Sequence, residues 1–273
     1  PAEMHARQTI AEALRLRREE SLGAVRVAER LGISADTVRD WFAGKLPKHA
    51  RDLAGGGGRP PCARCGHPEH DPEALPPYYP YLLGLYLGDG SISRHRRGVH
   101  RLRIYLDLAY PGIVAECVRA IAAVNPGRAV HQLERGGSYP SGPAPSNVQV
   151  SSYAKSWPCL FPQHGPGAKH TRRIWLAGWQ QRLAEARPDL LLRGLIHSDG
   201  CRSINTGRGG WRHPRYSFSN RSTDITSIFC SACDQLGLRW TAAFPAGETK
   251  AVTIYVSRKA DVARIDEFVG PKA

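Results

Sequence analysis

The sequence lacks any run of apolar residues that approaches the ~20 needed to span a bilayer. We also expect no secretory signal, because Arg15, Arg17 and Arg18 interrupt the first apolar stretch. Cysteine is scarce, and its seven copies are an odd number in a chain of 273 residues, which argues against a disulfide framework. We therefore expect a soluble protein of the prokaryotic cytoplasm or nucleoid, with two or three domains and no membrane partner.

Acidic residues are sparse in the C-terminal two-thirds of the chain. Residues 1–80 hold 12 Lys/Arg and 11 Asp/Glu, whereas residues 81–273 hold 26 Lys/Arg and only 13 Asp/Glu. Most of these cations are arginines, whose planar guanidinium suits phosphates and guanine edges. The excess favours nucleic acid as the partner; the alternative is a basic surface kept for solubility or for contact with a membrane.

The first 50 residues have the pattern of three short helices. Gly32 permits a tight turn, and Ser34 is a favourable N-cap for a helix from Ala35 to about Phe42. This pattern is typical of a helix-turn-helix, in which Thr37 and Arg39 would face DNA. An ordinary three-helix bundle is the alternative, and the near-neutral charge of the region predicts at most a modest contribution to DNA binding.

Residues 51–80 read as a linker that carries a metal-binding pattern. After GGGG at 55–58 come Cys62 and Cys65, followed by His67 and His70. Thiolates and imidazoles are the ligands that zinc takes in tetrahedral structural sites. The histidines follow the second cysteine so closely that one ligand could come from elsewhere. We predict a small structural zinc clamp here, with a chance cluster in a loop as the alternative.

From residue 81 onward the chain repeats itself. Leu82–Gly90 reads LLGLYLGDG and Leu192–Gly200 reads LRGLIHSDG, with the second Asp–Gly 110 residues after the first. Each copy is followed by the pattern of two strands, a helix, two more strands and a last helix. Counted from the motif aspartates, Asp107 matches Ser217. The predicted domains are 1–50, 51–80, 81–168 and 169–273.

Both nonapeptides resemble the LAGLIDADG motif, and the αββαββα pattern around each is similar to the domain of the LAGLIDADG homing endonucleases. The resemblance covers residues 81–273. It implies an α+β fold of two pseudo-symmetric αββαββα domains, here with an N-terminal all-α helix-turn-helix. It also implies a monomeric, metal-dependent endonuclease of the homing type that cuts both strands of a long DNA target site. Because the family includes regulators on such scaffolds, a sequence-specific DNA-binding transcriptional regulator is the alternative.

The residues of the motif fit that chemistry. Small residues four apart, at Gly84 and Gly88 and again at Gly194 and Ser198, would let two helix backbones approach closely. Two carboxylates brought together at helix C-termini repel each other and attract a cation such as Mg²⁺ or Mn²⁺. The resemblance makes Asp89 and Asp199 the metal ligands. The backbone carbonyls of Gly88 and Ser198 are further candidates.

Two lysines and a set of arginines complete the predicted site. Lys169 and Lys272 each follow the last strand of their half, where the family tends to place a basic residue near the active site. They would stabilise charge on the phosphate or position the attacking water; contact with the DNA backbone alone is the alternative. Little is expected of the sixth motif position, which holds Leu87 and His197. The predicted DNA contacts on the basic strands are Arg94, Arg96, Arg101, Arg103, Arg202, Arg212 and Arg215.

Overall fold

The computed structural model describes residues 6–20, 22–48, 50, 75–135, 146–206, 210–244 and 251–270. It separates into two units, residues 1–69 and 70–273, and each is described by itself. Five candidate residues lie outside the described residues, so their roles stay predictions: Cys62, Cys65, His67, His70 and Lys272.

The N-terminal unit is all-α, as its sequence predicts. Its helices are α1 (Arg7–Glu19), α2 (Ala24–Leu31) and α3 (Ala35–Phe42). Gly32 ends α2 at a φ of +66°, a left-handed conformation that glycine adopts without strain. The Ser34 side chain accepts a hydrogen bond from the Asp36 amide at 3.3 Å and thereby caps α3. The apolar faces of the three helices form a small separate core.

The second unit contains one order of elements twice, which is the predicted αββαββα repeat. A further helix, α7 (Gly178–Ala186), lies between the two copies. The first copy consists of α4 (Tyr79–Asp89), β1 (Gly90–Arg94), β2 (His100–Asp107), α5 (Pro111–Val124), β3 (Val130–Arg135), β4 (Asn147–Ala154) and α6 (Trp157–Leu160). The second consists of α8 (Pro188–Asp199), β5 (Gly200–Thr206), β6 (Arg212–Asn220), α9 (Thr223–Gln235), β7 (Thr241–Ala243), β8 (Val252–Val256) and α10 (Lys259–Val269).

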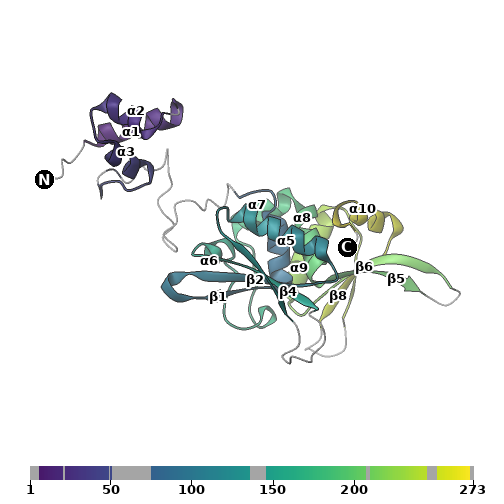
Figure 1. Ribbon diagram of the computed structural model, residues 1–273. Helices are drawn as coiled ribbons and strands as arrows, with labels where there is room; N and C mark the ends of the chain where they lie inside the picture. Colours follow the sequence, from purple (N-terminus) through teal and green to yellow (C-terminus); the bar gives the residue numbers. More distant parts are fainter. Residues whose placement is uncertain are drawn as a thin grey trace. The chain divides into compact units, whose positions relative to one another are not determined.

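Each copy builds a four-stranded antiparallel sheet, in the orders β1-β2-β4-β3 and β5-β6-β8-β7. In β2 the residues Leu102, Ile104 and Leu106 are buried while the residues between them are partly or fully exposed. Such alternation gives a sheet one face covered by helices and one outer face. Figure 1 shows hairpins β1–β2 and β5–β6 reaching out from the helices in opposite directions.

The motif helices α4 and α8 pack against each other at the centre of this unit. One continuous hydrophobic core includes residues of both copies, from Tyr79 to Val269. The two copies therefore form one compact unit. None of the described helices is both long and apolar enough to cross a membrane.

The strand register corrects the predicted match between the copies. Gly90 pairs with Ile104, whereas Gly200 pairs with Phe218, so Ile104 and Phe218 occupy equivalent places. Asp107 and Ser217 are therefore not equivalent. Counting from the motif aspartates failed because the β5–β6 hairpin has two more residue pairs than β1–β2 and is longer by four residues.

Candidate active site and nucleic-acid interface

The two motif helices cross at their small residues, as predicted. A Cβ atom built on Gly84 would lie 2.6 Å from the carbonyl oxygen of Leu191 and 2.7 Å from the amide of Leu195. A Cβ on Gly194 would collide with the carbonyl oxygen of Tyr81, and one on Gly88 with the side chain of Ser198. Because atoms do not approach so closely, only a missing side chain allows this contact between backbones.

The crossing brings the C-terminal ends of α4 and α8 together. Asp89 is the last residue of α4 and Asp199 the last of α8, and both are half-buried. Oδ2 of Asp199 lies 3.1 Å from the place that a Cβ of Gly88 would take, so this carboxylate reaches the end of the other helix. A carboxylate at a helix C-terminus meets the negative end of the helix dipole. This end of the pair is therefore a place where a cation is favoured.

Asn220, the last residue of β6, is a contact that the sequence analysis missed. Its Nδ2 donates a hydrogen bond to Oδ2 of Asp199 at 2.6 Å. Its Oδ1 accepts from the amide of Ser222 at 2.8 Å, which fixes the orientation of the side-chain amide. The sequence offered only the Asn-x-Ser pattern before α9, which is typical of a turn and a helix cap. This pattern does not predict that Asn220 contacts Asp199.

Lys169 lies at the same place, although it comes from the segment that connects the two copies. Its Nζ donates a hydrogen bond to the carbonyl oxygen of Gly88 at 2.8 Å and lies 5.2 Å from the ring centre of Tyr86. Burial lowers the pKa of the Lys169 ammonium to about 8, although the carboxylates of Asp199 and Asp89 oppose the shift. An amine that titrates near neutral pH beside two carboxylates is typical of a functional site.

A buried polar network holds the connecting segment against the core. Gln163 Nε2 donates to the side-chain oxygen of Gln180 at 2.5 Å and to the carbonyl oxygen of Trp175 at 2.7 Å. Gln180 in turn donates to the hydroxyl of Tyr79 in α4 at 2.7 Å. Arg172 donates to the carbonyl oxygen of Gln163. These bonds lie on both sides of Lys169 in the chain and fix the path along which it reaches α4.

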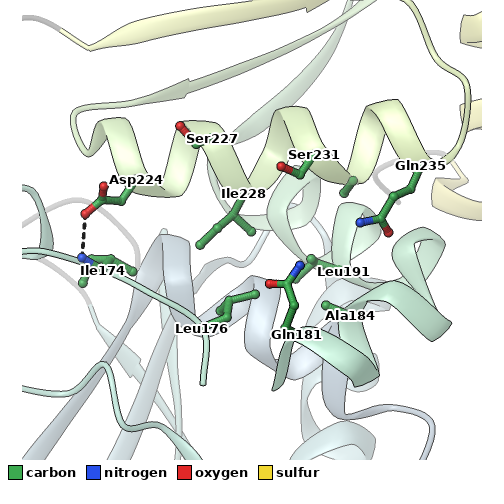
Figure 2. Close-up of a pocket in the computed structure, with 11 residues that line it drawn as sticks. Ile174, Leu176, Gln181, Ala184, Leu191, Asp224, Ser227, Ile228, Ser231 and Gln235 are labelled. Atoms are coloured by element: carbon green, nitrogen blue, oxygen red, sulfur yellow. Dashed lines mark hydrogen bonds between the residues drawn. The ribbon is translucent and has the colours of Figure 1, made fainter. Parts of the chain in front are cut away.

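The connecting segment is also tied to α9. Asp224 Oδ2 accepts a hydrogen bond from the amide of Ile174 at 2.7 Å, as Figure 2 shows. Beside this bond lies a cavity of about 220 Å³ with apolar walls, among them Leu176 and Ile228, and a polar rim. None of the predicted site residues lines it. This cavity therefore lies where the connecting segment contacts α9, and neither Asp89 nor Asp199 lines it.

A second cavity, of about 300 Å³, opens at the ends of the motif helices. Its lining combines a carboxylate, an amide, a backbone carbonyl and a lysine. These residues are Leu87, Gly88, Lys169, His170, Asp199, Ser219, Asn220, Arg221, Ile225 and Ala251. Carboxylate and carbonyl oxygens are the donors that Mg²⁺ and Mn²⁺ prefer, so the residues present fit such an ion. A carbonyl oxygen has two lone pairs, so the bond from Lys169 leaves Gly88 able to contribute.

The sixth motif position is more important than the sequence suggested. His197 is buried, and its Nδ1 lies 3.0 Å from the hydroxyl of Tyr81 in α4. Its Nε2 lies 3.3 Å from the carbonyl oxygen of Val269, at the end of α10. One turn away, Arg193 of α8 forms a bidentate ion pair with Glu116 of α5, at 2.7 and 2.9 Å. These contacts link the two copies through polar groups as well as through the core.

The outer faces of the two sheets carry three of the predicted arginines. Arg101, Arg103 and Arg215 lie on strands β2 and β6, between residues that face the helices. The Nε atom of each is buried without a hydrogen-bond acceptor, and none of the three forms an ion pair with a carboxylate in the described part of the chain. Arg101 and Arg215 lie over the rings of Tyr153 and Tyr255, at 5.3 and 4.5 Å. The ring contacts hold Arg101 and Arg215 in place, and among the described residues all three guanidinium groups lack an acidic partner.

The other predicted arginines have different positions. Arg94, Arg96 and Arg212 lie at the exposed ends of the two hairpins. Arg202 pairs with Tyr216 across the strands, on the face covered by helices, and it donates to both carboxylate oxygens of Asp266 at 2.8 and 2.9 Å. Arg202 therefore differs from Arg101, Arg103 and Arg215, and its contact with DNA stays a prediction. The reason for the difference is strand alternation, which turns this side chain towards α10.

The candidate contacts of the N-terminal unit lie on α3. Thr37 is half-buried, and Arg39 is exposed and forms an ion pair with Asp36. Asp40 on the same helix pairs with Lys45 at 2.8 Å. The acidic groups of α3 therefore neutralise the nearby cations. This arrangement differs from Arg101, Arg103 and Arg215 on the outer faces of the two sheets, for which the described part of the chain shows no carboxylate partner.

No protein-family model matches the chain, and no curated protein matches it. Solved structures do. A crystal structure of I-DmoI in complex with DNA and Ca has 14% identity and a TM-score of 0.48, over 74% of this chain and 92% of that one. The N-terminal LAGLIDADG domain of DUF199/WhiA has 14% identity and a TM-score of 0.43, over 74% and 85% of the two chains. The homing endonuclease I-WcaI bound to its DNA recognition sequence has 12% identity and a TM-score of 0.44, over 72% and 83% of the two chains.

The fold of this chain follows from the order and strand pairing of its own elements. With a LAGLIDADG-like nonapeptide on each central helix, they give residues 79–270 a two-repeat LAGLIDADG fold.

Proposed function

We propose that the protein is a metal-dependent endonuclease that binds a long site in duplex DNA and cuts both strands. The observation that supports this proposal most is the meeting of Asp89, Asp199 and Lys169 at one end of the two crossed helices. A protein that only binds DNA has no use for two carboxylates beside a phosphate. The proteins named above whose structures contain DNA are consistent with this reading.

The two sheets would hold the DNA. Between residues 90 and 106 there are five arginines and no acidic residue, and the same holds between residues 200 and 223. Guanidinium groups on the outer faces, which form no ion pair with a carboxylate among the described residues, would bind phosphates and base edges in the grooves. The N-terminal unit would add a smaller contact through Thr37 and Arg39. We further propose that one chain acts alone, with its internal pseudo-twofold matching the two strands, in the cytoplasm or nucleoid.

The residues of the site would then share the chemistry. Asp89 and Asp199, with the carbonyls of Gly88 and Ser198, would hold Mg²⁺ or Mn²⁺. When bound there, such an ion polarises a phosphate and lowers the pKa of an attacking water. Asn220 keeps the Asp199 carboxylate in one orientation, and Lys169 supplies positive charge close to the phosphate or accepts a proton from water. The connecting segment keeps Lys169 at the carbonyl of Gly88.

The test uses a library of randomised duplexes. The full chain first selects duplexes in Ca²⁺, which fills oxygen sites but activates water poorly, and the selected duplexes are then incubated with Mg²⁺ or Mn²⁺. The protein should cut both strands. Asp89→Asn and Asp199→Asn should bind the same duplexes and lose double-strand cleavage, because each removes one ligand at nearly constant volume. Glu185→Gln, which removes an exposed carboxylate on α7 at nearly constant volume, is the matched control and should cut normally.

A DNA-binding transcriptional regulator is the second candidate, and the three-helix N-terminal unit with its Ser34 cap favours it. On that reading a selected duplex would be bound tightly but left intact in Mg²⁺ and Mn²⁺. Asp89→Asn and Asp199→Asn would then bind the selected duplex as the wild-type protein does, and none of the three proteins would cut it. This outcome would replace the nuclease proposal with the regulator.

A further inference from the structure

The two hairpins that follow the motif helices, β1–β2 and β5–β6, differ in length. β1 and β2 form five residue pairs before the turn, and β5 and β6 form seven. In the sequence five residues separate the paired strands of each hairpin, 95–99 in one and 207–211 in the other, so the difference lies wholly in the number of residue pairs. Two more pairs at about 3.3 Å per residue lengthen the second hairpin by ~7 Å. Along duplex DNA that distance corresponds to about two base pairs.

The two hairpins also end differently. The last residue before the second strand is Val99 in the first hairpin and Trp211 in the second. The Trp211 side chain is 44% exposed, and its ring centre lies 5.3 Å from that of His213. His213 pairs with Asn205 on the outer face of the second sheet, in line with Arg215. A large apolar ring is thus presented on the side of the arginines, at the far end of the longer hairpin.

The surroundings of this ring suit DNA. The hairpin has no acidic residue, and Arg212 is exposed beside Trp211. In the major groove the apolar feature that a base offers is the thymine methyl group. An indole positioned by a neighbouring ring loses little conformational entropy when it contacts such a group.

We propose, on the basis of the proposed DNA-binding function, that the two sheets recognise half-sites of unequal length. The second hairpin contacts about two base pairs more than the first, and Trp211 selects thymine at the outermost of these positions. Asp199 then lies on the side of the longer half-site and Asp89 on the side of the shorter one.

The test is the same selection from randomised duplexes in Ca²⁺, carried out with the full chain and three variants. Trp211→Ala removes the ring. Val99→Ala changes the equivalent place in the first hairpin, and Trp175→Ala removes an exposed tryptophan of the connecting segment. All three positions are exposed or at a turn, and thermal unfolding checks that each variant folds.

The original protein should select a site with one longer half, ending in thymine. Trp211→Ala should lose the preference at that end alone, while the Val99 and Trp175 variants keep it. Replacing the terminal thymine by uracil, which lacks only the methyl group, should weaken binding of the original protein about fourfold, the value of one buried methyl group. The same replacement should leave the affinity of Trp211→Ala unchanged.

Half-sites of equal length, or an outermost position that Trp211→Ala leaves unaltered, would overturn the inference while the DNA-binding function stands. If no sequence is enriched with any of the proteins, the proposed function fails, and the inference fails with it.

Discussion

Asn220 holds Asp199 by a hydrogen bond of 2.6 Å, and the equivalent position of the first repeat is occupied by a leucine. The strand register places Leu106 at the equivalent position, since Ile104 matches Phe218. Leu106 is buried and has no polar group to offer Asp89. The two carboxylates of the site therefore have different neighbours, although the motif that contains them is repeated.

The first prediction follows from this difference. Asn220→Leu, which gives the second repeat the residue of the first, should slow cleavage of one strand by about 10- to 100-fold, the usual effect of removing a partner of a metal ligand. The other strand should be cut at nearly the original rate. Strand-specific nicking of an end-labelled duplex measures both rates. Gln181→Leu, which removes an exposed amide on α7, is the control. Equal slowing of both strands would show that Asn220 has no special link to Asp199.

The second prediction concerns Lys169 and pH. Its lowered pKa, about 8, means that the amine is charged below that pH and neutral above it. The charged amine neutralises the carboxylates that a divalent cation needs. The affinity for Mg²⁺ should therefore increase as pH rises through 8. Below pH 8, Mg²⁺ binding should release a proton from Lys169. Titration calorimetry in buffers of different ionisation enthalpy measures that proton. Lys169→Met should remove the pH dependence, whereas the exposed Lys155→Met should keep it. Proton release that is unchanged in Lys169→Met would assign the titration to another group.

The third prediction tests the crossing of the motif helices. Gly194→Ala places a Cβ against the carbonyl oxygen of Tyr81 and forces the helices apart. Overpacking of this kind should lower the free energy of unfolding by ~1–3 kcal/mol, measured by denaturant unfolding. Gly178→Ala, whose nearest neighbour would be 3.9 Å away, is the matched control and should cost nothing. A stable Gly194→Ala variant that still cuts DNA would mean that the crossing tolerates a wider separation.

The fourth prediction concerns the cysteines and histidines outside the described residues. Protein prepared without chelators should contain about one zinc ion per chain, bound through Cys62, Cys65, His67 and His70. The double variant Cys62→Ser/Cys65→Ser should lose it, while Cys201→Ser, an exposed cysteine on β5, should keep it. Elemental analysis decides this directly. Metal-free protein that folds and functions normally would leave the pattern as a chance cluster.

Much of the fold could be predicted because its signals are local. The strand pattern after each motif predicted the two hairpins, and the small residues of the motif predicted the close contact of α4 and α8. Ser34 and Gly32 marked the ends of helices in the N-terminal unit. In each case a few neighbouring residues determine the element.

The parts that were missed depend on contacts between distant segments. Asp266 is 64 residues from Arg202, and nothing near either residue shows that α10 meets β5. Glu116 and Arg193 are 77 residues apart, and their ion pair exists only because the two repeats fold against each other. The extra length of the second hairpin lies in the sequence, but only strand register shows that it belongs to paired strands.

The crossing of α4 and α8 has a consequence for how such a chain could be divided. A break between residues 161 and 177 would leave each half with one aspartate and a bare glycine surface open to water. The two halves would then have to associate before the two carboxylates could act together. The rate of cleavage would therefore depend on the product of the concentrations of the two halves. Covalent continuity removes that dependence, so under the proposed function a single copy of the chain would bring both carboxylates to the DNA in the same encounter.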